Sequence, residues 1–169
     1  IPAKIDRILE NDEIIKEFAE EIKNKSSLFY IGRGLDYATT IEAALKLKEV
    51  SYIHTEAFAA GELKHGTISL IEEGTPVIAI MSQENLTAKT LSNVEEVVAR
   101  GANVFIITSH KDSRMEKITN KIFNLPETLD ILYPLLTVIP TQLMAYYTSK
   151  AKGIDVDKPR NLAKSVTVE

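Results

Sequence analysis

Charged side chains able to move protons gather between residues 42 and 49. Glu42, Lys46 and Glu49 are three or four residues apart, so a helix over this segment places them on one face. The simplest interpretation is a solvated face with two ion pairs, each contributing a few tenths of a kcal/mol. A carboxylate and a lysine that line a cleft would instead suit acid–base chemistry, and the spacing alone leaves both interpretations open.

Two loops carry further candidate residues. His65 stands in a turn bracketed by Gly61 and Gly66, where its ring could reach a cleft, although a lone loop histidine is usually structural or exposed. The segment Gly32-Arg33-Gly34 closes an apolar run and precedes a helical pattern, which is the place for an anion-binding loop. A dinucleotide site would need a third glycine at position 37, where a tyrosine stands, so no nicotinamide cofactor is expected.

The elements that position these residues alternate between strand and helix. Three uninterrupted apolar runs have the length of buried strands, and two weaker runs extend the pattern: residues 28–31, 77–80 and 104–107, then 53–58 and 121–125. Helical periodicity covers residues 12–22, 36–50, 85–100 and 132–152, the last with a kink or restart at Pro140. Strands this apolar, alternating with helices, predict a parallel sheet covered on both faces.

Two finer predictions concern the helix over residues 36–50. Its apolar pattern predicts an inner face made of Ala38, Ile41, Ala44 and Leu45. Open α/β sheets bind ligands at the carboxyl ends of their strands. We therefore expect Glu49 and Lys46, at the end of this helix, to lie near that edge of the sheet.

Composition excludes several classes of function. The 169 residues suffice for one α/β domain, and the net charge of −4 gives no general electrostatic reason to bind nucleic acid or an anionic membrane. No apolar run approaches the roughly 20 residues of a membrane span, and no signal peptide is visible. The absence of cysteine excludes disulfides, thiolate metal sites and thiol catalysis. Because the chain starts at Ile1 rather than Met, we expect a piece of a longer protein.

Three longer segments are more specific than these patterns. They are residues 42–49 (EAALKLKE), 56–66 (EAFAAGELKHG) and 155–169 (DVDKPRNLAKSVTVE). Together they resemble the sugar-isomerase (SIS) domains of the glucosamine-6-phosphate synthase, or glutamine–fructose-6-phosphate aminotransferase, family. The resemblance implies a flavodoxin-like three-layer α/β/α sandwich around a five-stranded parallel sheet. It also implies a SIS domain over residues 1–154 and a carboxy-terminal tail over residues 155–169.

The family carries two SIS domains in tandem behind a glutaminase domain, and this chain resembles the second. Copies that bind phosphate have a Gly-x-Gly-Thr/Ser loop and a Ser-Gln-Ser-Gly-x-Thr loop. The equivalent segments here are Gly32-Arg-Gly-Leu-Asp36 and Ser82-Gln-Glu84-Asn85. Because Asp36 and Glu84 would repel a phosphate, we expect this copy to bind a sugar phosphate poorly.

The resemblance implies the conversion of fructose 6-phosphate to glucosamine 6-phosphate and gives five residues a role in it. His65 would shuttle the proton that opens the sugar ring, which suits a side chain that titrates near neutral pH. Glu49 would move a proton from C1 to C2, assisted by Lys46. Lys164 would form a Schiff base with the open-chain ketone, for which an amine needs a lowered pKa, and Ala163 would contact the substrate. The tail is therefore expected to fold over the site.

The resemblance also implies partners and a compartment. We expect a cytoplasmic homodimer in which the histidine loop enters the site of the other subunit, with no cofactor, metal, nucleic acid or membrane involved. The chain alone should be inactive, because it lacks the glutaminase domain and the phosphate-binding copy. A rival interpretation is a regulatory SIS module that binds sugar phosphates without turnover, against which the ELKHG and NLAKSVTVE segments argue.

Overall fold

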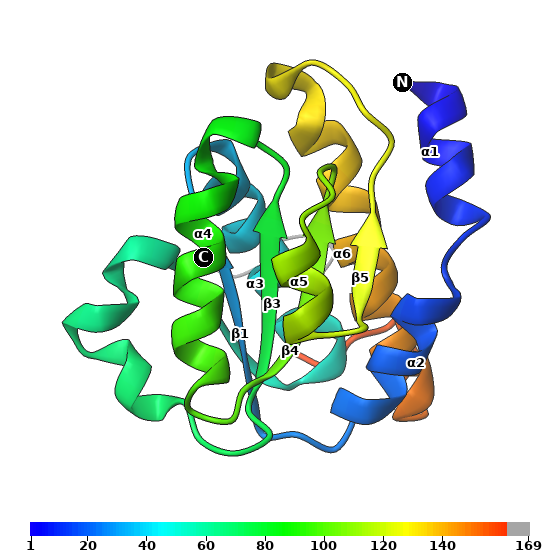
Figure 1. Cartoon of the computed structure of the whole chain (residues 1–169). Coiled ribbons are helices and arrows are strands. Elements are labelled where there is room, and N and C mark those ends of the chain that lie inside the picture. Colours follow the sequence, from blue (N-terminus) through cyan, green and yellow to red (C-terminus); the bar gives the residue numbers. More distant parts are fainter. Residues whose placement is uncertain (162–169) are drawn as a thin grey trace, which may run out of the picture.

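The computed structural model describes residues 1–161, which form a five-stranded parallel sheet between two layers of helices (Figure 1). The strand order is β2-β1-β3-β4-β5, and every neighbouring pair is parallel. The strands are β1 (Ser27–Gly32), β2 (His54–Ala59), β3 (Pro76–Met81), β4 (Asn103–Thr108) and β5 (Ile122–Asn124). The three-layer sandwich predicted from the sequence is confirmed. The three strongest apolar runs are the central strands, and the two weaker runs are the edges.

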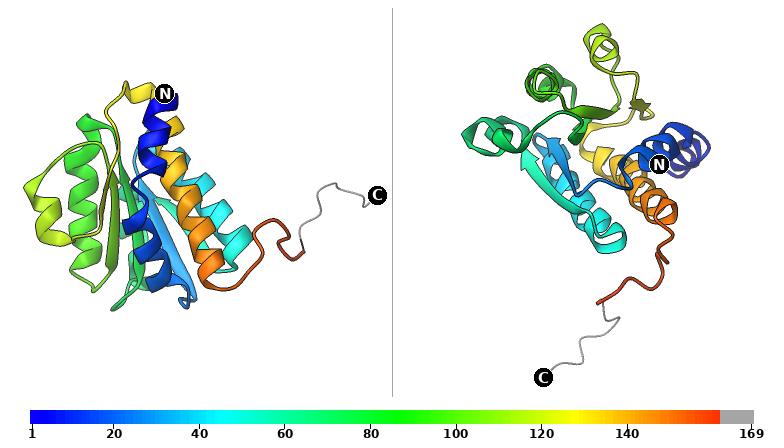
Figure 2. Two further views of the ribbon diagram at one scale, coloured as in Figure 1. Left: turned by 90° about the vertical axis from the view of Figure 1, so that its right-hand side faces the viewer. Right: turned by 90° about the horizontal axis from the view of Figure 1, so that it is seen from below.

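Helices cover both faces of the sheet, which Figure 2 shows from the side and from below. One face carries α1 (Pro2–Leu9), α2 (Glu13–Ile22), α3 (Leu35–Ser51) and α6 (Tyr133–Ala151). The other carries α4 (Glu84–Val98), α5 (Ser113–Ile118) and the 3₁₀ helices η1 (Ala60–His65) and η2 (Thr67–Leu70). A third 3₁₀ helix, η3 (Asp130–Leu132), leads into α6.

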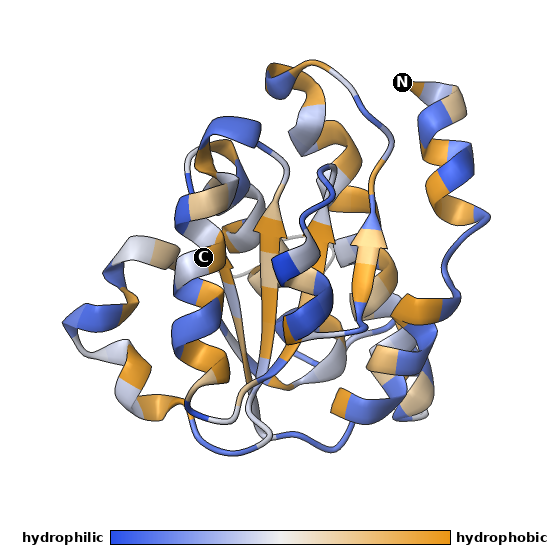
Figure 3. Ribbon diagram, viewed as in Figure 1, coloured by the Kyte–Doolittle hydropathy of each residue, from blue (hydrophilic) through white to orange (hydrophobic). Residues whose placement is uncertain are grey.

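The central strands send alternate side chains into two separate cores, because successive residues of a strand point to opposite faces. Tyr30 and Ile78 belong to the core beneath α2, α3 and α6. Their neighbours Phe29 and Val77 belong to the core beneath α4 and η1. Burial on both sides explains why these strands are apolar without interruption, as the colouring of β3 and β4 in Figure 3 shows.

Helix α3 buries a different face from the predicted one. Ala44 is buried as predicted, but Ala38 is exposed, and the side chains of Ile41 and Leu45 are 51% and 41% exposed. The buried face consists mainly of small side chains: Thr39, Thr40, Ala43 and Ala44, followed by Leu47. Small residues let α3 lie close to the sheet and to α6, so the larger apolar pair is left on the outside.

Two other features differ from the sequence pattern. Helix α6 continues through the buried Pro140 as one helix, so the predicted restart does not occur. Its packing against α2 and α3 outweighs the one backbone hydrogen bond that a proline removes. The pattern also does not predict the short helices α1 and α5. Within residues 1–161, no helix combines the length and the apolar character needed to cross a membrane.

Candidate functional site

Glu49 and Lys46 lie at the amino-terminal edge of the sheet. Helix α3 begins at Leu35, next to the carboxyl end of β1, and ends at Ser51, just before β2 starts at His54. A helix that connects two parallel strands has to return the chain to the starting edge, so its last turn lies far from the carboxyl ends. The prediction that these residues lie near the carboxyl ends is therefore wrong.

A salt bridge joins Lys46 to Glu49 at this edge. Lys46 Nζ lies 2.8 Å from Glu49 Oε2 and 3.9 Å from Glu42 Oε1. The hydrogen bond with Glu49 raises the pKa of Lys46, so Lys46 is an ammonium group at neutral pH. The Glu49 side chain is only 25% exposed. The helical spacing predicts this ion pair, which holds the Glu49 carboxylate in place next to a charged neighbour.

A pocket of about 430 Å³ lies beside Glu49. It is lined by the end of α3, the start of β2 and residues that follow α6: Lys48, Glu49, Tyr52, Ile53, His54, Arg160 and Asn161. The backbone N–H of Arg160 donates to the Tyr52 hydroxyl at 2.8 Å, and the guanidinium carbon lies 4.1 Å from the centroid of the Tyr52 ring. The chain beyond α6 thus reaches back to the pocket of Glu49. Ala163 and Lys164, to which the family resemblance gives a role in the site, lie outside the described residues.

His65 lies on the other side of the sheet from Glu49. It ends η1, whose Ala60 and Leu63 belong to the core beneath α4, whereas α3 contributes to the opposite core. The His65 side chain is 74% exposed, and its Nε2 lies 3.8 Å from Glu62 Oε2. A single chain therefore does not bring the two predicted proton-transfer residues together.

The crevice between the carboxyl ends of β1 and β3 is occupied by a carboxylate of the chain itself. Asp36, in the first turn of α3, is 2% exposed and accepts hydrogen bonds from the Ser82 backbone N–H at 2.8 Å and from the Ser82 hydroxyl. Burial raises the pKa of Asp36 above its usual range, although the hydrogen bonds from Ser82 act in the opposite direction. Asp36 does more than repel an anion, because it already uses the donors that an anion would need.

The side chain of Gln83 closes the same crevice. Its Oε1 accepts a hydrogen bond from the Leu35 backbone N–H at 2.7 Å, and a Cβ at Gly34 would lie 2.6 Å from that oxygen. Gly34 has φ +57°, so glycine is needed there for both space and backbone conformation. Glu84 is exposed at the start of α4 and lies beside the crevice rather than in it.

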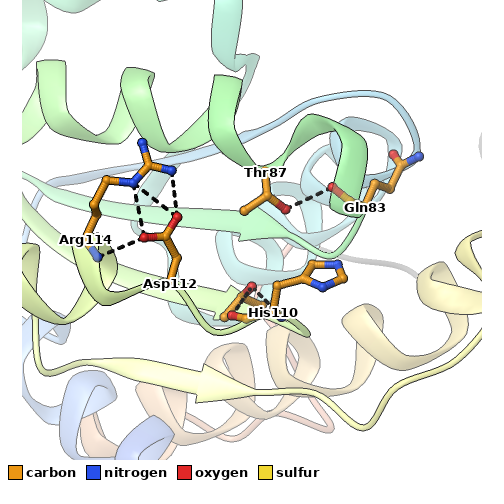
Figure 4. Close-up of polar contacts among 6 residues, drawn as sticks. Gln83, Thr87, His110, Asp112 and Arg114 are labelled. Carbon is orange, nitrogen blue, oxygen red and sulfur yellow. Dashed lines mark hydrogen bonds and ion pairs between the residues drawn. The ribbon is translucent and has the colours of Figure 1, made fainter.

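A larger pocket, about 810 Å³, opens at the carboxyl ends of β4 and β5, and of its lining residues only Glu84 is singled out by the sequence. Figure 4 shows two of its polar contacts, the pairing of Asp112 with Arg114 and the hydrogen bond that the Thr87 hydroxyl donates to the Gln83 carbonyl oxygen. Asp112 pairs with Arg114 at 2.6 Å, which lowers the pKa of the Asp112 carboxyl, and His110 Nε2 lies 3.0 Å from the Ser82 carbonyl oxygen. The feature of the sequence that could have indicated this pocket is the polar run Ser109 to Asp112 directly after β4. Among residues 1–161 there is no group of three or more side chains suited to hold a metal ion.

The family model described as "SIS domain" matches residues 21–150 of the chain. The chain belongs to the SIS domain family. Over all 169 residues it is 54% identical to glutamine–fructose-6-phosphate aminotransferase [isomerizing] of Caldanaerobacter subterraneus subsp. tengcongensis and 56% identical to that of Clostridium tetani. The match covers 100% of this chain but only 28% of each relative, so the SIS chain spans little more than a quarter of their length.

Solved structures agree with this assignment. The C-terminal domain of glucosamine-fructose-6-phosphate aminotransferase from Francisella tularensis superposes with a TM-score of 0.83 at 38% identity, over 92% of this chain and 44% of that one. A putative tagatose-6-phosphate ketose/aldose isomerase from Clostridium novyi has a TM-score of 0.84 at 22% identity, over 96% of this chain and 44% of that one, and supports the fold alone. The resemblance stated from the sequence is confirmed.

Proposed function

We propose that this SIS chain is the carboxy-terminal part of the isomerase half of a glucosamine-6-phosphate synthase. The complete protein would convert fructose 6-phosphate and glutamine-derived ammonia into glucosamine 6-phosphate, for amino sugar biosynthesis in the cytoplasm. The observation that carries the proposal is the identity of more than half of all positions with aminotransferases of that name, over the whole chain. Residues 1–154 would be the domain, and residues 155–169 a catalytic tail.

The pocket of Glu49 supports an isomerisation role. Isomerisation moves a proton from C1 of the aminated open-chain sugar to C2, which requires a base that can give the proton back. Glu49 is partly withdrawn from water and fixed by Lys46, so its carboxylate is oriented toward one position. Lys46 stays protonated and would stabilise negative charge that develops on the substrate, while Lys164 would form the Schiff base and Ala163 would contact the sugar.

The remaining functions of the site would come from other parts of the protein. Asp36 fills the crevice of this SIS domain, so the sugar phosphate would be bound by the first SIS domain, and ammonia would come from the glutaminase domain. His65 lies across the sheet from Glu49, which supports a homodimer in which His65 of each chain serves the site of the other. Exposed apolar side chains offer a surface for the preceding domain: Ile41, Leu45, Leu129, Ile131 and Leu135. A sugar-phosphate sensor is supported less well, because the filled crevice removes the binding site that a sensor needs.

The base role can be tested with Glu49→Gln in the full-length enzyme. The amide keeps the size of the side chain but cannot accept the proton, so amino-sugar formation should fall about 100-fold or more. Glu42→Gln is the matched control, because Glu42 faces the same Lys46 from one turn away and should retain near-normal turnover. A folded Glu49→Gln enzyme with more than about a tenth of wild-type turnover would contradict the proposal.

A further inference from the structure

The pocket of Glu49 contains both strained backbone positions of the described chain. Among residues 1–161, only Tyr52 (φ 62°) and Asn161 (φ 61°) are non-glycine residues with positive φ. Both line this pocket. Such conformations persist only where surrounding contacts enforce them, and they concentrate at functional sites. Tyr52 follows α3 and Asn161 comes after α6, so the pocket lies where two segments that are distant in the chain meet.

Tyr52 is the residue that joins them. It follows the last turn of α3 in the left-handed conformation, where helices usually place a glycine. A tyrosine there carries a steric cost that glycine avoids, so its side chain must serve another purpose. The hydroxyl accepts the Arg160 backbone N–H at 2.8 Å, and the ring lies 4.1 Å beneath the Arg160 guanidinium carbon. One side chain therefore holds both the backbone and the side chain of Arg160.

This contact bounds where the tail can reach. Lys164 follows Arg160 by four residues, a length of chain that spans at most about 14 Å when fully extended. Glu49 lies in the last turn of α3, and its side chain and that of Tyr52 line the same pocket. Holding Arg160 against Tyr52 therefore fixes the start of the tail at the pocket that Glu49 lines.

We propose that Tyr52 and Arg160 form a clamp that positions the tail, so that Lys164 and Glu49 act on the same sugar. The inference rests on the proposed function, and it assigns Tyr52 a positioning role rather than a catalytic one. The clamp confines the tail before substrate binds, so less ordering remains to be done during the reaction. Its loss should reduce the rate of imine formation much more than the affinity for fructose 6-phosphate.

Borohydride trapping in the full-length enzyme measures this directly. The Lys164 amine adds to the C2 carbonyl of fructose 6-phosphate and water leaves; borohydride then delivers a hydride to the imine and fixes it as a secondary amine. Tyr52→Gly removes the clamp but suits the positive φ, so the melting temperature should stay unchanged or rise. The yield of adduct at Lys164 and kcat should each fall at least about tenfold, with KM changed less than about threefold.

Two further variants separate the parts of the clamp. Tyr52→Phe keeps the ring beneath Arg160 but loses the hydroxyl, so a loss of about fivefold is expected, between wild type and Tyr52→Gly. Arg160→Ala should reduce trapping as well, and combining it with Tyr52→Gly should add little, because Tyr52→Gly already removes the contact between the ring and the guanidinium. Tyr146→Phe is the matched control: Tyr146 also lies beneath a cation, Lys150, but does not line this pocket, and the adduct yield of this variant should be normal.

The outcomes distinguish the clamp from the proposed function. If wild-type enzyme gives no adduct at Lys164, or if Lys164→Arg still makes amino sugar, both ideas are overturned. If the wild-type adduct forms and Tyr52→Gly keeps more than about a third of it, only the clamp is wrong. Loss of activity together with a lower melting temperature in Tyr52→Gly would show a merely structural residue and overturn the clamp too.

Discussion

Replacing Asp36 should turn the closed crevice into an anion site. In the double variant Asp36→Ser/Glu84→Ser, hydroxyls stand where this chain carries acids, and the Ser82 N–H and hydroxyl lose their acceptor. An unsatisfied buried N–H costs about 1–3 kcal/mol, and losing an acid from the first turn of α3 costs about 0.5 kcal/mol. The variant should therefore be less stable than wild type by about 1.5–3.5 kcal/mol in a buffer without phosphate.

Phosphate should restore part of that stability. With a dissociation constant of about 1 mM, 10 mM phosphate stabilises a folded protein by about 1.4 kcal/mol. For a domain of this size, that corresponds to a rise in melting temperature of about 3–6 °C. The measurement is thermal unfolding in phosphate against chloride at equal ionic strength.

The wild-type chain and Glu84→Ser alone are the controls, because both keep Asp36 in the crevice. Neither should respond to phosphate beyond the effect of ionic strength. A double variant that folds but gains no stability from phosphate would refute the idea that Asp36 stands in for a bound anion. So would an equal rise in the wild-type chain.

Three further predictions follow from the same contacts. The isolated chain should bind fructose 6-phosphate too weakly for calorimetry at micromolar concentrations and should not convert it; a dissociation constant in the low micromolar range would instead favour the sensor interpretation. Tyr147→Phe should destabilise the chain by about 1–2 kcal/mol in urea, because the Tyr147 hydroxyl donates to the largely buried Asp12 carboxylate, whereas Tyr146→Phe on the exposed side should change stability little. Burial raises the pKa of Asp36 in the folded chain, so the stability that Asp36 contributes is complete below the unfolded pKa near 3.8 and is lost as pH rises through the folded pKa. The difference in unfolding free energy between wild type and Asp36→Ser should therefore shrink as pH rises, and a difference that grows with pH would contradict the raised pKa.

The sequence predicts the sheet well because each central strand is buried on both faces. A run such as Val77 to Ile80 has no polar side, which only a doubly covered strand tolerates. The Lys46–Glu49 contact is equally local, since it depends only on helical spacing. Both predictions depend on neighbours in the chain, and both are confirmed.

The faces of α3 could not be predicted in the same way. The helix has two apolar stripes, one containing Ile41 and Leu45 and the other containing Ala43, Ala44 and Leu47, and periodicity alone does not say which one meets the sheet. Because α6 packs closely against α3, the stripe of small residues is the one that is buried. The hydrogen bonds of Asp36 could not be predicted either, because its partner Ser82 is 46 positions away. The sequence shows only an acidic residue in a loop where the family pattern has a hydroxyl or glycine.

The groups that a complete site would need lie in separate parts of this fold. The rule that ligands bind at carboxyl ends applies to loops that follow strands, but Glu49 belongs to a helix on its way back to the starting edge. Within the described residues the carboxyl-end crevice is filled by Asp36, Glu49 lies at the amino-terminal edge on one face, and His65 lies on the other face. Rotating their side chains cannot bring Glu49 and His65 together, because the sheet lies between them. For a reaction that needs a phosphate cradle, His65 and Glu49 together, we therefore propose that another domain supplies the cradle and another chain supplies the histidine. Mixing full-length Glu49→Gln subunits with full-length His65→Ala subunits tests this proposal. If each site takes Glu49 from one subunit and His65 from the other, every hybrid dimer has one intact site, and the activity of the mixture should approach a quarter of wild type. No recovery in dimers shown to have exchanged subunits would place both residues in a site formed by one chain.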